Sequence, residues 1–407
     1  MPTPPAILQV LPALHSGGVE RGTVEIAQAI ARAGYRALVA SAGGAMAREV
    51  EAVGGRHVTL PLDRKSPAAL VANAGALARL IRAEGVRIVH ARSRFPAWSA
   101  FWAARRTGVR FVTTYHGVYS EDFPGKRLYN SVMVRGDRVI AISEHVAEVI
   151  RRRHGIGPDR LRLIPRGVDV SAFDPDAIPP ERIAALRAAW GVPERHPVVM
   201  LPGRLSRWKG QGTFLTALSR LGEDGPTGIL VGEGDYRAEL ERDAATLGLG
   251  DRLLLPGITR DMPAALMLAN LAVHASTKPE PFGRTVIEAQ AMRVPVIAAD
   301  LGAPRETVEE GVTGWRVPPD DPAALAGAIR RALALPPDAL AAIGAAARAA
   351  VLARYTTAAM QAATLDVYRE LLRGSWSSSS RPWATSCWPS APSRRSARII
   401  RAPMSPC

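Results

Sequence analysis

The sequence predicts an α/β protein of two Rossmann-like domains that face each other across a central cleft. Buried strand-like runs alternate with helical runs through residues 6–164, which is typical of a parallel sheet covered by helices. The same alternation restarts at Pro197, after a proline-rich connection. A chain of 407 residues is long enough for two domains that each bury a core. Because ligands of open α/β sheets bind beyond the carboxyl ends of the strands, we expect the functional residues there.

Domain boundaries follow from the two alternating halves. We expect an N-terminal domain over residues 1–170, a linker over 171–196 and a C-terminal domain over 197–355. A final helix over 356–372 is expected to cross back toward the N-terminal domain. The expected strands are 6–14, 35–41, 86–90, 111–115, 138–142, 161–164, 198–201, 229–231, 252–255, 271–275 and 294–298, and the expected helices include 19–33, 67–83, 144–153, 213–219 and 284–292.

The last stretch, 373–407, differs from the rest in composition. From Gly374 onward it holds five arginines, three tryptophans and no acidic residue, and no helical or strand period. Such a segment is expected to be disordered in isolation. One hypothesis is that it is an off-frame translation of GC-rich DNA, and the competing hypothesis is a basic tail that binds a membrane.

The amino-acid composition limits the cellular compartments and the kinds of partner that we expect for this protein. The two cysteines, Cys387 and Cys407, lie in the last stretch, so residues 1–386 hold no thiol. No apolar run reaches the length of a transmembrane helix and the first residues lack a signal-peptide pattern, so we expect a cytoplasmic protein. The formal charge of +15 suggests an anionic partner. Since no nucleic-acid-binding motif is evident, we expect peripheral attachment to the inner face of the cytoplasmic membrane and no nucleic acid.

Two carboxylates, Glu280 and Glu288, flank a tight loop in the C-terminal half. A buried strand precedes them, Pro281-Phe282-Gly283 breaks the chain, and a helix follows from Arg284. The unpaired N–H groups of a helix start suit an anionic or polyhydroxylated ligand, and a carboxylate beside them can accept hydrogen bonds from hydroxyls. This loop therefore suggests a sugar-nucleotide site, with Phe282 and Gly283 among the residues expected to bind the donor. From the two carboxylates alone, ordinary surface glutamates are the simpler interpretation.

Glycine-rich turns end the first strand of each half. The turn from Gly203 to Gly210 carries Arg204 and Lys209. A guanidinium can grip phosphate oxygens in pairs and an ammonium supplies a compact charge, so this turn suits a diphosphate. Gly17-Gly18 makes the corresponding turn in the N-terminal half.

Three further candidates close strands of the N-terminal half. His116 follows the strand 111–115, at the end where α/β enzymes place chemistry. Arg92 and Arg94 follow the strand 86–90 and are expected to bind a phosphate or carboxylate of an acceptor. Solvated surface arginines are an equal alternative.

This ordered set of motifs resembles the retaining glycosyltransferases of family 4, which have the GT-B fold, and the resemblance covers residues from about 6 to 372. The E-x7-E segment implies that Glu280 contacts the donor sugar and that Glu288 holds the ribose hydroxyls. The G-R-L-x-x-x-K-G segment implies that Arg204 and Lys209 bind the donor diphosphate.

The resemblance assigns roles to other positions as well. It implies that Gly17-Gly18 lets the backbone approach the diphosphate from the opposite domain and that His116 contacts the transferred sugar. Glu233, in a glycine-acid turn, falls near the nucleotide base. Arg166 stands where the family has Asn, so a contact specific to Asn is left open.

A retaining, metal-independent hexosyltransferase is the function that the resemblance implies. It would move a sugar from a UDP- or GDP-linked donor to a glycolipid or polysaccharide acceptor, in lipopolysaccharide or cell-envelope glycan synthesis. No cofactor is expected beyond this donor substrate, and no Asp-x-Asp metal site is evident. The alternatives are a nucleotide-sugar epimerase or phosphorylase on the same fold and a non-catalytic nucleotide-sugar-binding protein. A dehydrogenase is disfavoured because no G-x-G-x-x-G follows the first strand.

Overall fold

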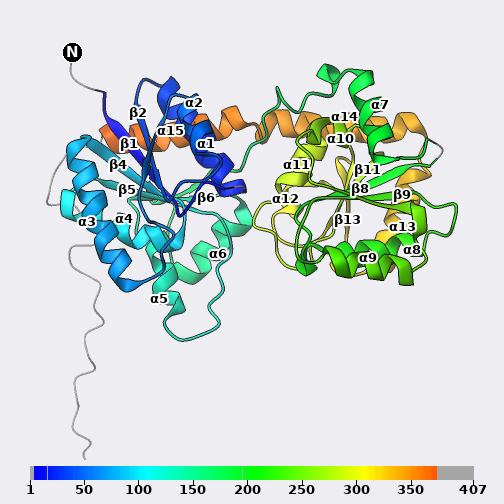
Figure 1. Cartoon of the computed structure of the whole chain (residues 1–407), viewed down its shortest axis with the longest axis horizontal. Coiled ribbons are helices and arrows are strands. Elements are labelled where there is room, and N and C mark those ends of the chain that lie inside the picture. The colour runs from blue at the N-terminus through cyan, green and yellow to red at the C-terminus, as the bar shows by residue number, and fades with distance from the viewer. Residues whose placement is uncertain (1–3, 16, 195, 374–407) are drawn as a thin grey trace, which may run out of the picture.

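The computed structural model describes residues 4–15, 17–194 and 196–373. It contains two parallel sheets in two domains that lie side by side (Figure 1). The N-terminal sheet has seven strands in the order β3-β2-β1-β4-β5-β6-β7, and the C-terminal sheet has six in the order β10-β9-β8-β11-β12-β13. In each sheet the strand order reverses beside the first strand of the domain, which is the point where open α/β sheets bind ligands.

The N-terminal domain carries the longer sheet. Its strands are β1 (Ala6–Val10), β2 (Arg36–Ser41), β3 (Arg56–Thr59), β4 (Val86–Ala91), β5 (Arg110–Tyr115), β6 (Arg138–Ala141) and β7 (Leu161–Leu163). Its helices are α1 (Gly18–Arg32), α2 (Ala47–Ala52), α3 (Pro67–Ala83), α4 (Arg94–Thr107), α5 (Lys126–Asn130), the 3-10 helix η1 (Ser131–Val134) and α6 (Glu144–His154). Every residue of β1 is buried because this strand is central in the sheet and covered on both faces.

The C-terminal domain repeats the design. Its strands are β8 (Val198–Pro202), β9 (Thr227–Val231), β10 (Leu253–Gly257), β11 (Leu271–His274), β12 (Val296–Ala299) and β13 (Gly314–Val317). Its helices are η2 (Pro175–Ala177), α7 (Pro180–Trp190), η3 (Arg207–Lys209), α8 (Gln211–Ser219), α9 (Arg237–Thr246), η4 (Gly250–Arg252), α10 (Met262–Leu266), α11 (Arg284–Ala291), α12 (Pro304–Thr307), α13 (Pro322–Leu333) and α14 (Pro337–Arg354).

Local signals set the helix ends that matter for the site. The Ser143 hydroxyl accepts a hydrogen bond from the N–H of Val146 at 3.1 Å and so begins α6. Gly155 ends this helix in the left-handed region, at φ 63°. Ser66 caps α3 in the same way, and Pro67 fills its first position, where the missing N–H costs nothing.

Apolar clusters fill both faces of each sheet. Ile178 and Val192 are buried in the core of the C-terminal domain, and α7 packs against α10. The segment 171–196 therefore does more than link the domains, because several of its apolar side chains pack against the C-terminal core. Sequence periodicity alone did not reveal this packing, since α7 has no fully buried residue.

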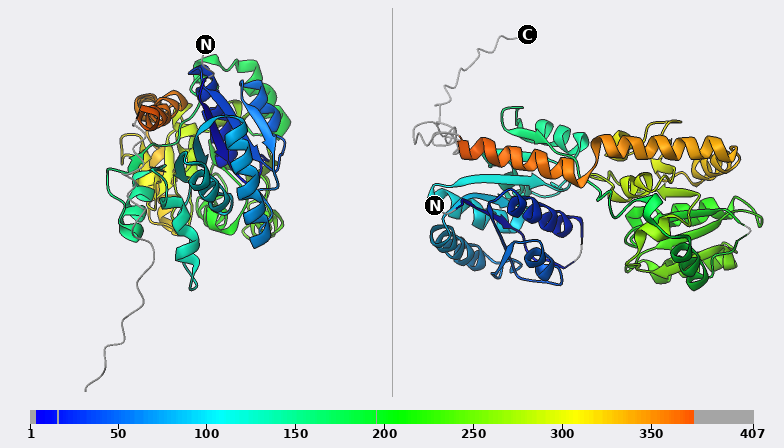
Figure 2. Two further views of the ribbon diagram at one scale, coloured as in Figure 1. Left: turned by 90° about the vertical axis from the view of Figure 1, so that its left-hand side faces the viewer. Right: turned by 90° about the horizontal axis from the view of Figure 1, so that it is seen from above.

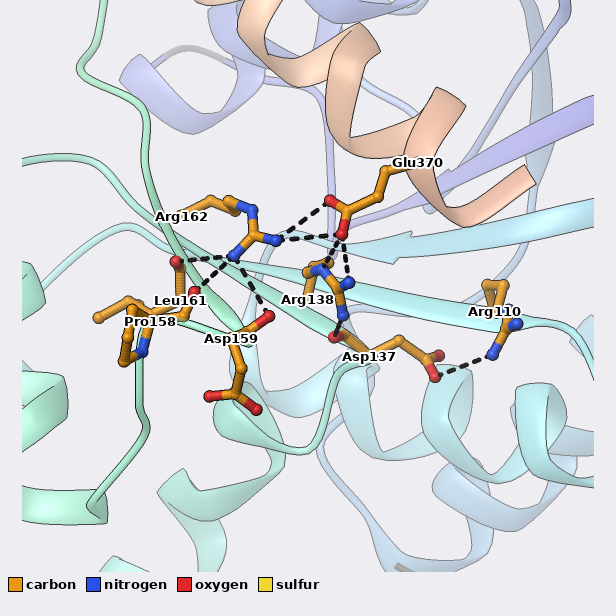
Figure 3. Close-up of polar contacts among 8 residues, drawn as sticks. All are labelled: Arg110, Asp137, Arg138, Pro158, Asp159, Leu161, Arg162 and Glu370. Carbon is orange, nitrogen blue, oxygen red and sulfur yellow. Dashed lines mark hydrogen bonds and ion pairs between the residues drawn. The ribbon is translucent and has the colours of Figure 1, made fainter. Parts of the chain in front are cut away.

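The final helix, α15 (Thr357–Arg373), returns to the N-terminal domain as predicted and packs on α1. Figure 2 shows α14 and α15 following one another along one side of both domains. The Tyr368 hydroxyl lies 2.6 Å from Nδ1 of the buried His90, whose Nε2 lies 2.7 Å from the hydroxyl of Thr114. Near the end of α15, the Glu370 carboxylate pairs with Arg138 and Arg162 (Figure 3). These contacts fasten the crossover helix.

The predicted elements are present, with shifted ends. The helix 67–83 has the predicted bounds, whereas the first strand ends at Val10 instead of residue 14. The strands β3 and β13 were not predicted. Residues 374–407 lie outside the described part of the chain, so both hypotheses about them stay untested. Within the described residues, no single helix is long and apolar enough to cross a membrane, although α13 and α14 together, bent by 111°, have the required length and composition.

Candidate active site

Several of the predicted site residues lie where the carboxyl ends of the two sheets meet. The Ser143 hydroxyl at the start of α6 donates a hydrogen bond to the carbonyl of Pro281 at 2.6 Å. The Glu306 carboxylate of the C-terminal domain accepts hydrogen bonds from the N–H groups of Glu144 and His145 at 2.8 and 2.6 Å. The start of α6 therefore faces the C-terminal domain and brings the loop of Glu280 against the N-terminal domain.

A charged pair occupies the centre of this region. The Lys209 ammonium lies 2.6 Å from Oε2 of Glu280, and the Ser276 hydroxyl donates to the same oxygen at 3.2 Å. Nε2 of His274 lies 3.5 Å from it. Burial alone would raise the pKa of Glu280, but His274 and Lys209 outweigh that effect and hold the pKa at about 2. The carboxylate is therefore ionised at neutral pH and can accept hydrogen bonds from sugar hydroxyls.

Two glycines allow the pair to form. Gly210 has φ 77°, and a Cβ there would lie 1.8 Å from the carbonyl oxygen of Ala275, so a larger residue would push the Lys209 turn away from β11. Gly302 pairs with Glu280 in an isolated parallel bridge, and a Cβ on Gly302 would lie 2.6 Å from the backbone of Glu280. These close approaches fix both loops.

Glu288 lies on α11, one turn after Arg284, and these two residues connect the domains. Nε of Arg284 lies 3.4 Å from Glu288, and its Nη2 lies 3.7 Å from the carboxylate of Glu25 on α1. Burial raises the pKa of Glu288 above its ordinary value, and Arg284 opposes this shift only in part. The charged form of this carboxylate is therefore costly in the absence of a ligand, and its contact with ribose hydroxyls stays a prediction.

The N-terminal glycine turn faces this group. Gly17, at φ 146°, precedes α1, and a Cβ on Gly18 would lie 3.8 Å from Cδ of Arg284. Arg166 holds the turn, because its guanidinium donates a hydrogen bond to the carbonyl of Gly18 and packs on Gly22, where a Cβ would lie 2.1 Å from Nη1. Burial lowers the pKa of Arg166 to about 9, and Arg284 adds to the shift.

His116 and Arg92 lie on the N-terminal side. Burial lowers the pKa of His116 well below its usual range, and the nearby charges of Arg92 and Arg166 add to this, so the ring is neutral at neutral pH. Nε2 of His116 is buried and has no hydrogen-bond partner among the described residues. Arg92 is buried and donates to the side chain of Gln9 at 3.1 Å.

Other predicted residues make different contacts. Arg94 donates to Asn130 at 2.9 Å and lies over the ring of Tyr119, 4.2 Å from its centroid, so it does not join Arg92. The ring of Phe282 is buried and meets Tyr355 edge-on, which suits anchoring the loop rather than contacting a nucleotide.

Two predicted donor residues lie at the surface of the C-terminal domain. Arg204 is exposed on the Gly203 turn, five residues before Lys209 in the chain. Glu233 pairs with Arg237 at 3.0 Å, and its carbonyl accepts a hydrogen bond from the N–H of Leu205. Their roles stay predictions.

Sequence reasoning missed three residues of the site: His274, Ser276 and Arg284. His274 ends a buried strand two residues before Ser276, and this placement is a signal that could have identified it. The contact of Arg284 with Glu25 had no such signal, because it joins residues from the two domains. Within the described residues, no group of three or more His, Cys, Asp or Glu side chains could hold a metal ion, and metal independence stays a prediction.

Comparison with known proteins agrees with this geometry. The sequence-family model described as Glycosyltransferase Family 4 matches residues 16–172, and that described as Glycosyl transferases group 1 matches residues 183–350. A D-inositol 3-phosphate glycosyltransferase of Xylanimonas cellulosilytica is 31% identical over 317 residues, which cover 72% of this chain and 75% of that protein.

Solved structures share the fold over the same range. A glycosyltransferase from Rickettsia africae is 34% identical, with a TM-score of 0.84 over 91% of this chain and 100% of the other. Anabaena Alr3699/HepE in complex with UDP-glucose is 26% identical, with a TM-score of 0.79 over 90% and 99% of the two chains. Two parallel sheets with their motifs in this order, matched along the chain by these families, show that the protein is a glycosyltransferase of the family 4 type with the GT-B fold.

Proposed function

We propose that this glycosyltransferase transfers a sugar from a UDP-linked donor with retention of anomeric configuration and without a metal ion. The observation that carries the proposal is the pair of Lys209 and Glu280, beside the first turn of α11 and opposite the turn of Gly17-Gly18. A cation, a carboxylate and free N–H groups at a helix start suit a sugar diphosphate. The structures of Anabaena HepE hold UDP and UDP-glucose, which supports a UDP-linked donor over a GDP-linked one.

In the proposed reaction the bond from the sugar C1 to the diphosphate oxygen breaks, and a bond from C1 to the acceptor oxygen forms on the same face. The acceptor hydroxyl gives its proton to the departing diphosphate. Lys209 and Arg204 would stabilise the negative charge that develops on the leaving group. Such electrostatic stabilisation is usually the largest single contribution to catalysis. Glu280 would hold sugar hydroxyls, and the neutral imidazole of His116 has an unpaired Nε2 to offer the sugar from the other side.

We infer that the acceptor carries an anionic group. Arg92 and Arg166 are buried at the strand ends near His116, where they donate hydrogen bonds to the uncharged oxygens of Gln9 and Gly18. The carboxylates of Glu25 and Glu20 offset part of the cost of burying these two cations, but burial still lowers the pKa of both guanidinium groups. A phosphate or carboxylate of the acceptor would therefore lower the energy of this region. The related D-inositol 3-phosphate glycosyltransferases are named for a phosphorylated compound, which supports such an acceptor.

The acceptor that we propose first is an anionic glycolipid or cell-envelope glycan intermediate, such as one of lipopolysaccharide synthesis. The enzyme would work in the cytoplasm, at the inner face of the cytoplasmic membrane, because the formal charge of +15 favours an anionic surface. A soluble inositol phosphate is the second candidate, since the relative from Xylanimonas cellulosilytica bears that name.

Transfer assays test the function. The protein is incubated with radiolabelled UDP-sugars and either a bacterial membrane extract or D-inositol 3-phosphate, with EDTA present, and the anomeric configuration of the product is determined by NMR. We expect a retained product that forms in EDTA and disappears in Glu280→Gln. An inverted product would overturn retention, and inactivity restored by a divalent cation would overturn metal independence. Release of free sugar or an epimerised UDP-sugar without acceptor would favour the epimerase alternative.

A further inference from the structure

We propose that an arginine-lined pocket in the N-terminal domain binds the phosphate headgroups of an anionic phospholipid membrane, while the neighbouring segment 120–130 inserts apolar side chains. This proposal rests on the proposed peripheral location and names the surface responsible. The pocket has a volume of about 860 Å³ and lies at the amino ends of β5 and β6, whereas the active site lies at the carboxyl ends of the strands. Arg110 and Arg138, which begin β5 and β6, line it together with the last turn of α6.

Charge is the first argument. Nine arginines but only two aspartates line the pocket. One of these aspartates, Asp137, already accepts a hydrogen bond from the N–H of Phe111 at 2.8 Å and lies 3.5 Å from Arg110 (Figure 3). The carbonyls at the end of α6 carry partial negative charge that offsets some of the excess, but their effect fades within one turn.

The carboxylates that reach in from outside are also engaged. Glu370 pairs with Arg138 and Arg162 (Figure 3), and Glu144 pairs with Arg151. Glu121 lies 3.9 Å from Arg153. Even with these partners, cations outnumber carboxylates around the pocket. Guanidinium groups bind phosphate oxygens in pairs, so phosphate is the anion that this lining suits.

An unpaired nitrogen supports a ligand in the pocket. Nε2 of His154, a lining residue, is buried and has no hydrogen-bond partner among the described residues. Burial lowers the pKa of His154, so the ring is neutral and one of its nitrogens carries a proton that it can donate to a phosphate oxygen.

The exposed apolar side chains favour a membrane over a soluble anion. Phe123 is 60% exposed and Leu128 is 63% exposed, both on the segment 120–130. Arg127 of this segment lines the pocket and donates to the carbonyl of Arg153 at 2.8 Å, which ties the segment to the pocket. A soluble phosphate compound needs no such apolar side chains, whereas aromatic and aliphatic residues beside cations are the pattern of interfacial membrane binding.

The position of the pocket gives the docking a consequence. Its last-turn arginines end α6, and Ser143 at the start of the same helix contacts the loop of Glu280. An α-helix of 11 residues is roughly 16 Å long, so one rigid element separates the membrane contact from the donor site. Docking through this pocket would hold the active site at a fixed height above the membrane.

The test is co-sedimentation of the full chain with vesicles of phosphatidylcholine alone or with added phosphatidylglycerol. We expect binding only to the anionic vesicles. Arg152→Glu should lower it by at least about fivefold, because each basic residue near such a surface contributes about a factor of five and the substitution also adds a negative charge. Arg331→Glu on α13, which changes the charge equally at an exposed site, should lower it much less. All variants keep residues 374–407, so differences between them report on the pocket.

Two further measurements test the contribution of the apolar side chains and the identity of the anion. The double variant Phe123→Ser, Leu128→Ser should also weaken vesicle binding. Glycerol 3-phosphate, added at the same phosphate concentration as the vesicle lipids, should not displace the protein from the vesicles. Equal losses for Arg152→Glu and Arg331→Glu would overturn the proposal, and so would efficient competition by glycerol 3-phosphate together with full vesicle binding by the serine variant. UDP binding is measured on the same samples. A protein that binds UDP but not vesicles would refute this inference and leave the transferase proposal standing.

Discussion

The ammonium of Lys209 lies 2.6 Å from the carboxylate of Glu280, and both side chains are largely buried, at 20% and 13% exposure. The two residues come from different loops, separated by 71 positions in the sequence. The pair keeps a cation in the place where the donor diphosphate would lie and keeps Glu280 ionised. Because the diphosphate would compete with Glu280 for Lys209, donor binding would also free the carboxylate to accept sugar hydroxyls.

Removing the ammonium should weaken donor binding. In Lys209→Met the charge-assisted contact to the diphosphate is lost, and we expect the Kd for UDP to rise about 10- to 100-fold, equivalent to ~1.4–3 kcal/mol. Calorimetric titration measures this change. Arg207→Met is the matched control, because Arg207 pairs with Glu239 on the surface of α9, and its UDP affinity should stay near that of the wild type. Equal weakening in both variants would indicate a general loss of positive charge.

The Glu288 carboxylate should lower the stability of the free protein and should favour ligand binding. Its pKa in the folded protein is raised by burial, so its ionised form costs stability, and this cost grows as the pH rises through the range above its ordinary pKa. Glu288→Gln should therefore raise Tm at pH 7 while lowering UDP affinity. The gain in Tm should shrink when thermal unfolding is repeated at pH 4.

Glu280 should behave with the opposite sign. Its folded pKa of about 2 is depressed, so the charged form contributes stability that is present above the ordinary carboxyl pKa and is lost as the pH falls toward 2. Glu280→Gln should thus lower Tm at pH 7, and the difference from the wild type should narrow in acid. If both glutamine variants shift Tm in the same direction at pH 7, the electrostatic account of one of them is wrong.

Arg166 and Gly22 should be coupled. A Cβ at position 22 would lie 2.1 Å from Nη1 of Arg166, so Gly22→Ala should cost about 1–3 kcal/mol of the free energy of unfolding and displace the bond to Gly18. Arg166→Asn, which restores the residue usual in the family, makes room for the new methyl group. In a double-mutant cycle from denaturant unfolding, we expect Gly22→Ala to cost less in the Arg166→Asn background. Additive losses would contradict this packing.

Tyr368→Phe tests how the crossover helix is attached. The change removes a hydroxyl 2.6 Å from Nδ1 of His90 and leaves a buried polar atom unpaired, which should cost about 1–3 kcal/mol. Thermal unfolding should show a lower Tm. UDP affinity, measured at temperatures where the protein is folded, should be unchanged, since His90 is a buried residue of β4 and is not one of the residues proposed to contact the donor. Tyr355→Phe, which loses a single hydrogen bond to the carbonyl of Glu306, provides a comparison.

Much of the fold could be predicted from the sequence because the signals are local. The helix 67–83 has its expected bounds since Ser66 and Pro67 mark its start chemically. The strand β3 was missed because its residues, Arg56–Thr59, are only partly buried at the sheet edge and lack an apolar run. The packing of α7 on the C-terminal core could not be predicted for a related reason, since the apolar side chains of this helix are only half-buried.

The site could be predicted only where a single loop contains both a recognisable turn and a charged residue that suits the ligand. Lys209 and Glu280 stood out by their turns, but their direct contact joins two loops that the sequence does not relate. The partners Glu25 and Arg284 come from different domains, so no spacing along the chain could reveal them. The contacts of Arg94 with Asn130 and Tyr119 illustrate the same limit, because these partners lie far from it in the sequence. The role of Arg94 toward an acceptor stays a prediction.

Calorimetric titration of UDP, with GDP and ADP in parallel, into the wild type and Lys209→Met tests the central claim most directly. We expect UDP to bind the wild type more tightly than either other nucleotide does. The variant, still folded by circular dichroism, should bind UDP at least about tenfold more weakly than the wild type. Equal UDP binding by both proteins, or none by the folded wild type, would contradict a donor site built around Lys209 and Glu280.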